Sequence, residues 1–157
     1  MIYKKSWKYI LFKNTDYYCK NCRFFKIKSL KDFSDVSKND IGGYVNGYHN
    51  LSQSGNCWIY DTARISRRAK VTGNAIIKDS SLVTDNAIVS GDAIVSGNTM
   101  VFDFANINDN AKIYSTVVKD KAVVYGNTEL KGEIMITGTL RIGNNNDLQK
   151  ILEIPSI

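Results

Sequence analysis

The feature that most constrains the fold of this chain is a six-residue period that runs from Gly55 to Gly143. Each unit begins with two turn residues, often Gly, Asn or Asp, and continues with a small, an outward, an aliphatic and a second outward residue. Because side chains alternate within a strand, this pattern predicts one very short strand per unit. A six-residue repeat of this kind is typical of a β-helix.

Three such units close one coil of a triangular prism. Residues 55–114 supply ten units, residues 115–119 form one shortened unit, and residues 120–143 supply four, which predicts fifteen units or five coils. With adjacent strands about 4.8 Å apart, this prism would be roughly 24 Å tall. The strands of a β-sandwich recur about every 8–12 residues, so the six-residue period argues against a sandwich.

The alternating Ala and Val units resemble those of the hexapeptide-repeat proteins, whose prism is a left-handed parallel β-helix. The segment that enters the repeat, Ile41-Gly42-Gly43-Tyr44-Val45 and then residues 50–61, is similar to bacterial and phage-borne members of that family with no assigned function. The resemblance covers about residues 30–143. It implies an all-β fold, with the left-handed coil as an exception to the right-handed crossover rule. It implies little about activity, because one fold serves many functions.

The chain divides into three predicted segments. A basic, aromatic N-terminal cap spans residues 1–40, the β-helix spans residues 41–143, and a C-terminal capping tail spans residues 144–157. No apolar run approaches the ~20 residues that cross a membrane, and the N-terminus lacks the apolar core of a signal peptide. We therefore expect no membrane partner and a cytoplasmic location.

Both ends of the prism need cover, because an open end exposes strand edges and core. In the cap, residues 7–12 and 23–28 have strand-forming types, and residues 14–16 have turn-forming types. We expect them to form a small two- or three-stranded sheet over the first coil. In the tail, one of residues 144–147 caps a short predicted helix over residues 148–152.

The net charge of +6 is concentrated in the cap. Residues 1–31 hold nine Lys and Arg and one acidic residue, for a net +8, so the remaining 126 residues carry −2. Lysines interleaved with aromatic rings bind single-stranded nucleic acid, because cations follow phosphates while rings stack on bases. The same composition also suits a cap with an aromatic core and a solvated basic face. The residues expected to bind a macromolecular partner are Lys4, Lys5, Lys8, Lys13, Lys20, Arg23, Lys26 and Lys28.

Three cysteines and one histidine are the candidates for metal chemistry. Cys19 and Cys22 form a C-x-x-C pair which, with His49 and Cys57, has the composition of a Cys3His zinc site. Cys57 occupies a small inward position of its unit, which favours a core thiol instead, and the sequence has no second closely spaced ligand pair. We therefore predict no metal and no cofactor.

His49 also decides which enzymatic activities stay open. Acyltransferases of the hexapeptide-repeat family use a histidine as general base, often beside a loop extruded from the prism. The family's carbonic anhydrases need three histidines on one zinc, which a single histidine excludes. No loop longer than a turn interrupts residues 55–143. We expect His49 to be a turn or cap residue and predict no catalytic residue, with acyl transfer as an alternative.

The outward residues of one prism face carry the sharpest prediction. Every third unit lies on the same face, and the residues between the small and aliphatic positions form three columns. The second column is apolar in four consecutive coils, although the shortened unit leaves open whether Val117 or Val118 faces outward. The predicted oligomer or partner face consists of Leu82, Met100, Phe102, Val118 and Met135.

An exposed patch of this size is rare in a soluble monomer. Burying five such side chains at about 2 kcal/mol each contributes roughly 10 kcal/mol, which is comparable to the ~4–15 kcal/mol cost of association. A two-fold homodimer is therefore expected. The alternatives are apolar residues scattered over a regular surface, or a face covered by the C-terminal tail.

Together these features favour a non-enzymatic, dimeric binding scaffold. The resemblance suggests a phage or mobile-element accessory protein that docks a host macromolecular complex, protein or ribonucleoprotein, and inhibits it, such as a nucleic-acid-handling defence system. Two alternatives stay open: an acyltransferase-like enzyme using His49, and a protein that binds nucleic acid directly through the basic cap.

Overall fold

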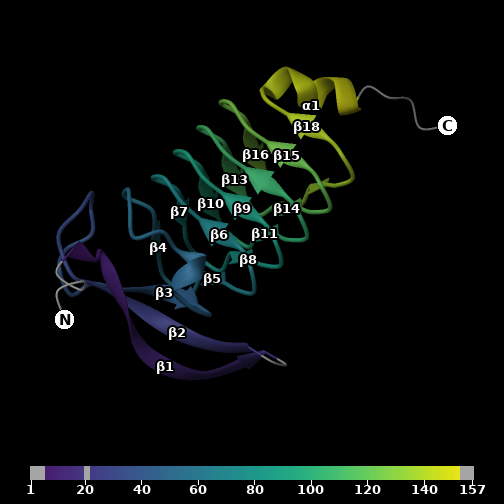
Figure 1. Ribbon diagram of the computed structural model, residues 1–157. Coiled ribbons are helices and arrows are strands. Elements are labelled where there is room, and N and C mark those ends of the chain that lie inside the picture. Colours follow the sequence, from purple (N-terminus) through teal and green to yellow (C-terminus); the bar gives the residue numbers. More distant parts are fainter. Residues whose placement is uncertain (1–5, 20–21, 153–157) are drawn as a thin grey trace.

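The fold is a parallel β-solenoid of about six turns. The computed structural model describes residues 6–19 and 22–152 of the chain. Figure 1 shows three sheets as the faces of a prism, with a hairpin at one end and a helix at the other. Each strand of the prism is short and is followed by a corner that leads to the next face.

Sheet A has eight strands and is the only one of the three that includes the hairpin. Its order is β1 (Tyr9–Cys19), β2 (Cys22–Ser29), β3 (Ile41–Val45), β5 (Arg64–Ile65), β8 (Leu82–Val83), β11 (Met100–Val101), β14 (Val117–Val118) and β17 (Met135–Ile136). Within it, β1 and β2 are antiparallel, β2 is antiparallel to β3, and β3 is parallel to β5.

The other two sheets have five parallel strands each. Sheet B contains β4 (Trp58–Ile59), β7 (Ile76–Ile77), β10 (Ile94–Ser96), β13 (Lys112–Tyr114) and β16 (Glu129–Lys131). Sheet C contains β6 (Lys70–Val71), β9 (Ile88–Val89), β12 (Asn106–Ile107), β15 (Val123–Val124) and β18 (Arg141–Ile142). This arrangement confirms the prediction of an all-β, hexapeptide-repeat β-helix.

The core follows the predicted alternation. The small and aliphatic positions point inward and are fully or almost fully buried, as at Ala75 and Ile77. The predicted shortened unit is also confirmed. Leu82 pairs with Met100 and Met100 pairs with Val117, so the second step is one residue shorter than the first.

The prism has one turn more than the five coils counted from the repeat, and that turn includes β3, which lies within the predicted β-helix of residues 41–143. The strand β3 pairs in parallel with β5 and adds a turn to the expected five coils. The count of units omitted this turn because Gly43 stands where the repeat otherwise favours Ala. A Cβ at Gly43 would lie 2.5 Å from the Ala63 carbonyl oxygen and 2.5 Å from Cγ2 of Ile59. The first coil is therefore too tight for the alanine that marks later units.

The predicted cap exists, but it is a continuation of sheet A. The strand β1 runs through residues 14–16, where a turn was expected, and absorbs the turn-forming residues as a register shift between Asn14 and Tyr18. The prediction of a turn there is wrong, because pairing with β2 outweighs local preference.

Two further segments cover the same end of the prism. In the loop of residues 30–40, the Phe33 ring packs edge-on against Trp58 of sheet B, with 5.4 Å between ring centroids. The 3-10 helix η2 (Tyr48–Asn50) covers the start of sheet C, where Asn50 Nδ2 donates to the Ala69 carbonyl at 2.9 Å. Each of the three faces therefore has its own cover at this end.

The helix α1 (Asn145–Leu152) lies at the far end, as predicted. Asn144 is its cap, because Asn144 Oδ1 accepts hydrogen bonds from the backbone N–H groups of Asn146 and Asp147. The Asp147 carboxylate reaches back to the N–H groups of Gly143 and Asn144. These reciprocal bonds satisfy the free donors of the first turn. Within the described part of the chain, no helix has the length and apolarity to cross a membrane.

Candidate functional site: the outer face of sheet A

The outward column of sheet A is the candidate site. Its strands place Arg64, Leu82, Met100, Val117 and Met135 in one line, each paired with the next. Met100 and Met135 are 41% and 56% exposed, whereas Leu82 and Val117 are half-buried. The structure corrects one predicted member, because Val118 is fully buried and Val117 takes the outward position. The shortened corner before β14 shifts the inward and outward alternation by one residue.

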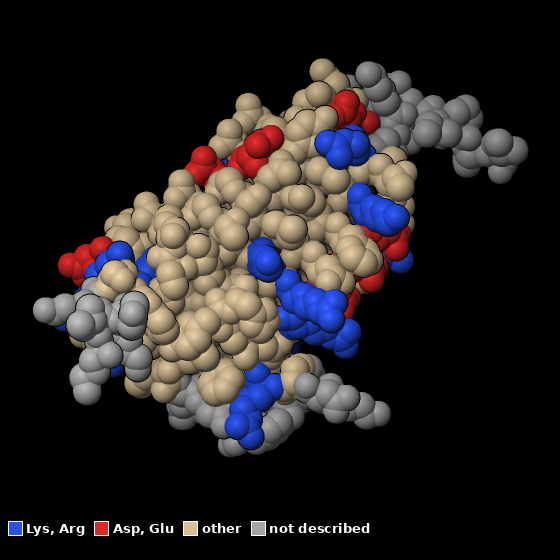
Figure 2. Space-filling view, in the orientation of Figure 1, with Lys and Arg blue, Asp and Glu red and all other residues tan. Residues whose placement is uncertain are grey.

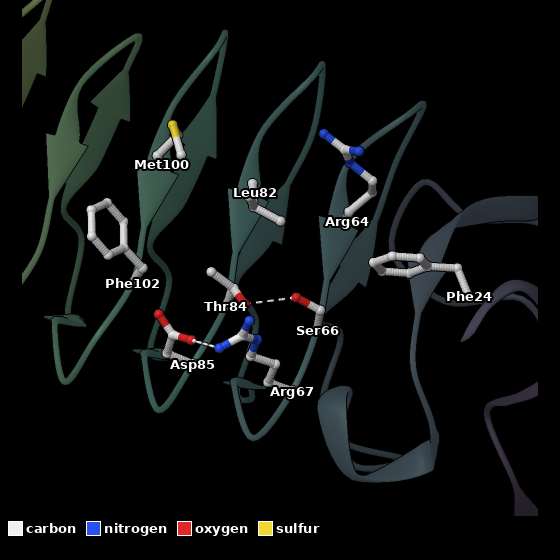
Figure 3. A pocket seen from close by; sticks show the side chains of 9 residues that line it. All are labelled: Phe24, Arg64, Ser66, Arg67, Leu82, Thr84, Asp85, Met100 and Phe102. Carbon is white, nitrogen blue, oxygen red and sulfur yellow. Dashed lines mark hydrogen bonds and ion pairs between the residues drawn. The ribbon is translucent and has the colours of Figure 1, made fainter. Parts of the chain in front are cut away.

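A shallow groove of about 340 Å³ crosses this face near its hairpin end. Figure 3 shows Arg64, Leu82 and Met100 in a row on successive strands, all on the same side of the sheet. Phe102 lies next to Met100 on that face, as predicted. Phe24 reaches the groove from β2 and was not predicted as part of it. No periodic signal marks Phe24, because the antiparallel hairpin brings it there from outside the repeat.

The polar side of the groove is internally satisfied. Arg67 Nη1 lies 2.9 Å from Asp85 Oδ1 in an ion pair. Ser66 Oγ donates to Thr84 Oγ1 at 2.7 Å. An exposed ion pair of this kind contributes about 0–1 kcal/mol. The groove thus presents an apolar row beside groups that already have partners, which suits contact with another apolar surface better than chemistry on a substrate.

The basic cap divides into residues with very different surroundings. Arg23 is exposed, while Lys26 and Lys28 are half-buried. Lys26 Nζ lies 4.7 Å from the centroid of the Tyr44 ring, and Lys28 Nζ lies 4.9 Å from that of Phe12. These cation–π contacts give the cap lysines a structural role. Lys4, Lys5 and Lys20, together with the side chain of Lys13, lie outside the described residues.

Lys8 is a correction to the predicted binding surface, because it lies fully buried at the end of the prism. Its ammonium donates to the carbonyls of Cys57 at 2.8 Å and Gly55 at 3.3 Å, and lies 3.2 Å from Cys57 Sγ. Burial lowers the pKa of Lys8, and the contact with Cys57 offsets part of that effect. A buried cation needs such partners, and residue type alone does not reveal them.

Figure 2 shows how the charges are distributed on the face seen in Figure 1. Basic side chains lie at the hairpin and along one border of the prism, where acidic side chains accompany them, while much of the middle is uncharged. Apart from Lys8, the described side chains of the cap include five basic ones (Arg23, Lys26, Lys28, Lys31 and Lys38) and three acidic ones (Asp32, Asp35 and Asp40).

Cys22, His49 and Cys57 do not form one cluster, and the side chain of Cys19 lies outside the described residues. Cys57 is a free, fully buried thiol in its predicted inward position, and Cys22 is disulfide-bonded. His49 is exposed, and its Nε2 lies 2.6 Å from the Arg67 carbonyl oxygen. Because a carbonyl only accepts, Nε2 carries the proton in this arrangement. Among the described residues, no group of three or more His, Cys, Asp or Glu is placed to hold a metal ion.

Comparison with known proteins gives limited information about activity. No protein-family model matches the chain. An alignment of 61 residues is 38% identical to a protein named uncharacterized acetyltransferase YdcK, from Escherichia coli (strain K12). The match covers 34% of this chain and 19% of that protein's length. Such a partial match fits the repeat architecture, and the activity in the name is that of the relative.

Proposed function

Because this chain is a hexapeptide-repeat parallel β-helix with an apolar outer face, we propose that it is a non-enzymatic binding scaffold that pairs with a second copy through sheet A. The observation that carries the proposal is the line of apolar side chains on successive strands, with Met100 and Met135 exposed at its centre and end. The groove beside Met100, with polar side chains that already have partners, supports the same use.

The energetics are compatible with a modest dimer. Leu82 and Val117 are already half-buried, so covering the face gains roughly 5 kcal/mol per copy at ~25 cal/mol per Å² of apolar surface. A two-fold axis buries the face twice, for about 10 kcal/mol against an association cost of ~4–15 kcal/mol. We expect a dimer that dissociates on dilution, because the two terms are of similar size.

Light scattering after size exclusion tests the pairing with a matched pair of variants. Met100→Asp places a charge in the proposed interface and is expected to halve the measured mass. Ile88→Asp places the same charge at the equivalent outward position of sheet C, where the side chain is 39% exposed against 41% for Met100. The control is expected to keep the wild-type mass. A monomeric wild type, or equal masses for both variants, contradicts the proposed face.

The finer part of the proposal concerns a second partner. We infer from the resemblance and from the charge of the cap that the scaffold docks a host nucleic-acid-handling complex. Reversing the three described surface charges, Arg23, Lys26 and Lys28, to Glu is expected to weaken that docking while Lys8 stays in place to hold the fold. Unchanged docking by the triple variant argues against the cap. Binding of a free oligonucleotide that falls steeply with salt supports direct nucleic-acid binding instead.

The acyltransferase alternative is favoured by the name of the partial relative alone. His49 is not among the residues that line the sheet A groove, and Nδ1 is the nitrogen left to act as a base. A His49→Ala variant that loses acetyl transfer from an acetyl thioester to an amine or hydroxyl would move the function to this class.

A further inference from the structure

The contact between Lys8 and Cys57 has a chemical consequence that is separate from the docking face. The two residues are 49 positions apart in the sequence, and Lys8 Nζ lies 3.2 Å from Cys57 Sγ. Both are fully buried where the start of β1 meets the first coil. An amine and a thiol are therefore held in direct contact by the fold.

The groups around this pair hold it in place and do not compete with it. Lys8 Nζ faces the carbonyls of Ser54, Gly55 and Cys57 and the Phe33 ring, with 5.3 Å to its centroid. Cys57 Sγ has the Ser52 carbonyl at 3.6 Å and the Val71 carbonyl at 3.8 Å. Carbonyl oxygens and a phenyl ring do not capture oxidised sulfur, so the Lys8 nitrogen is the nucleophile at hand.

The state of the amine also favours reaction. Burial lowers the pKa of Lys8, which raises the share of neutral amine with a free lone pair. Dioxygen is small and apolar, so it dissolves in a protein core without a surface opening.

We propose that Lys8 and Cys57 form an oxygen-dependent covalent cross-link in which one oxygen atom bridges Lys8 Nζ and Cys57 Sγ. One N–H and one S–H bond break, and one N–O and one O–S bond form. Dioxygen is the oxidant: it accepts two electrons from nitrogen and two from sulfur. One of its oxygen atoms becomes the bridge, and the other leaves as water with the two hydrogens released from the broken N–H and S–H bonds.

The bridge would tie the cap to the prism. Lys8 lies at the start of β1, and Cys57 immediately precedes β4. A bond between them closes a long loop and restricts the unfolded chain, which stabilises the folded one. The oxidised chain would therefore hold its N-terminal end more firmly than the reduced chain.

Intact-mass measurement tests the proposal in a Cys19→Ser, Cys22→Ser background, where Cys57 is the only thiol. The folded chain is prepared reduced without oxygen and then exposed to oxygen-saturated buffer. The expected gain is about 14 Da, one oxygen added and two hydrogens lost, against about 16 or 32 Da for sulfenic or sulfinic acid. Digestion is expected to yield one species that joins the Lys8 and Cys57 peptides and separates with dithiothreitol.

Two variants keep the result interpretable. Cys57→Ala fills the inward position with the residue most units use there and is expected to fold and to gain no mass. Lys8→Arg keeps a positive charge but lacks a reactive amine, so it is expected to leave the thiol free. A folded, oxygen-treated chain with a free Cys57 thiol overturns the proposal, and so does oxidation of Cys57 without a joined peptide.

Discussion

The N-terminal end of the prism and its repeating coils solve the same problem in different ways. In the coils, each strand is paired by the next copy of the same unit, and corner residues such as Asp79 accept a backbone hydrogen bond from the next coil. At the N-terminal end no further copy exists, and single side chains form hydrogen bonds with the backbone groups instead. Examples are Lys8, Asn50 and Gln53. The repeat therefore distributes its stabilising contacts over many equivalent residues, whereas the N-terminal end depends on a few side chains.

Lys8→Ala is expected to produce the largest loss, about 4 kcal/mol of unfolding free energy. It removes a buried side chain and leaves carbonyls without a donor. Urea unfolding followed by circular dichroism measures the loss. Lys70→Ala, at an exposed position of sheet C, is the control and is expected to change stability by less than about 0.5 kcal/mol. Equal effects of the two would mean that the end does not depend on Lys8.

Two glycines allow a corner that packs against a neighbouring coil to be compared with a corner that faces open space. Gly126 has φ +63° and a Cβ there would lie 2.2 Å from the Gly143 carbonyl oxygen, whereas Gly138 has φ +69° and open space. Gly138→Ala is expected to cost the ~1–2 kcal/mol of a left-handed residue. Gly126→Ala adds a backbone collision and is expected to cost about 3 kcal/mol. Thermal unfolding compares the two losses of stability. A larger loss for Gly138→Ala would show that the next coil shifts at little cost to accommodate the added Cβ.

The smallest expected effect is the acid sensitivity of one corner. Asp120 Oδ2 accepts hydrogen bonds from Thr137 Oγ1 at 2.6 Å and from the Gly138 N–H at 2.9 Å, which together hold the pKa of Asp120 below its usual 3.8. The folded state therefore favours the carboxylate, and its contribution is present above pH 3.8 and is lost as pH falls further.

Asp120→Asn tests this corner because the amide oxygen keeps an acceptor but cannot titrate. The difference in unfolding free energy between wild type and variant is expected to be constant near neutrality and to shrink below about pH 4. Unfolding midpoints measured across this range supply the comparison. A difference that does not change with pH would assign the role of Asp120 to its shape and not to its charge.

The repeat could be predicted because its information is local. Six neighbouring residues specify a strand and a corner, so the outward columns of sheets B and C and the shortened unit follow from the sequence alone. The C-terminal helix was predicted over residues 148–152, but it begins at Asn145, three residues earlier. The sequence does not decide whether Val117 or Val118 faces outward, because a unit of five residues allows two inward and outward alternations. The pairing with Met100 decides between them.

The cap could not be predicted in the same way because its contacts join distant positions. The sequence predicts a surface cation at Lys8, since nothing near it in the sequence shows that Cys57 and Gly55 surround it. Phe24 enters the groove for the same reason. Residues 14–16 do not form the expected turn, because β1 pairs with β2 along its length. This cross-strand pairing outweighs the local preference of the residues for a turn.

The way the hairpin closes sheet A limits how copies of this chain can assemble lengthwise. The exposed edge at the start of β1 is occupied by the Gln53 amide, which accepts from the Lys8 and Tyr9 N–H groups and donates to the Tyr9 carbonyl. A strand from another molecule finds those groups already engaged. Head-to-tail growth into a filament requires two open ends per subunit. At Lys8 and Tyr9 the Gln53 amide takes the place that a strand of another molecule would occupy, so this stretch of the edge disfavours end-on growth.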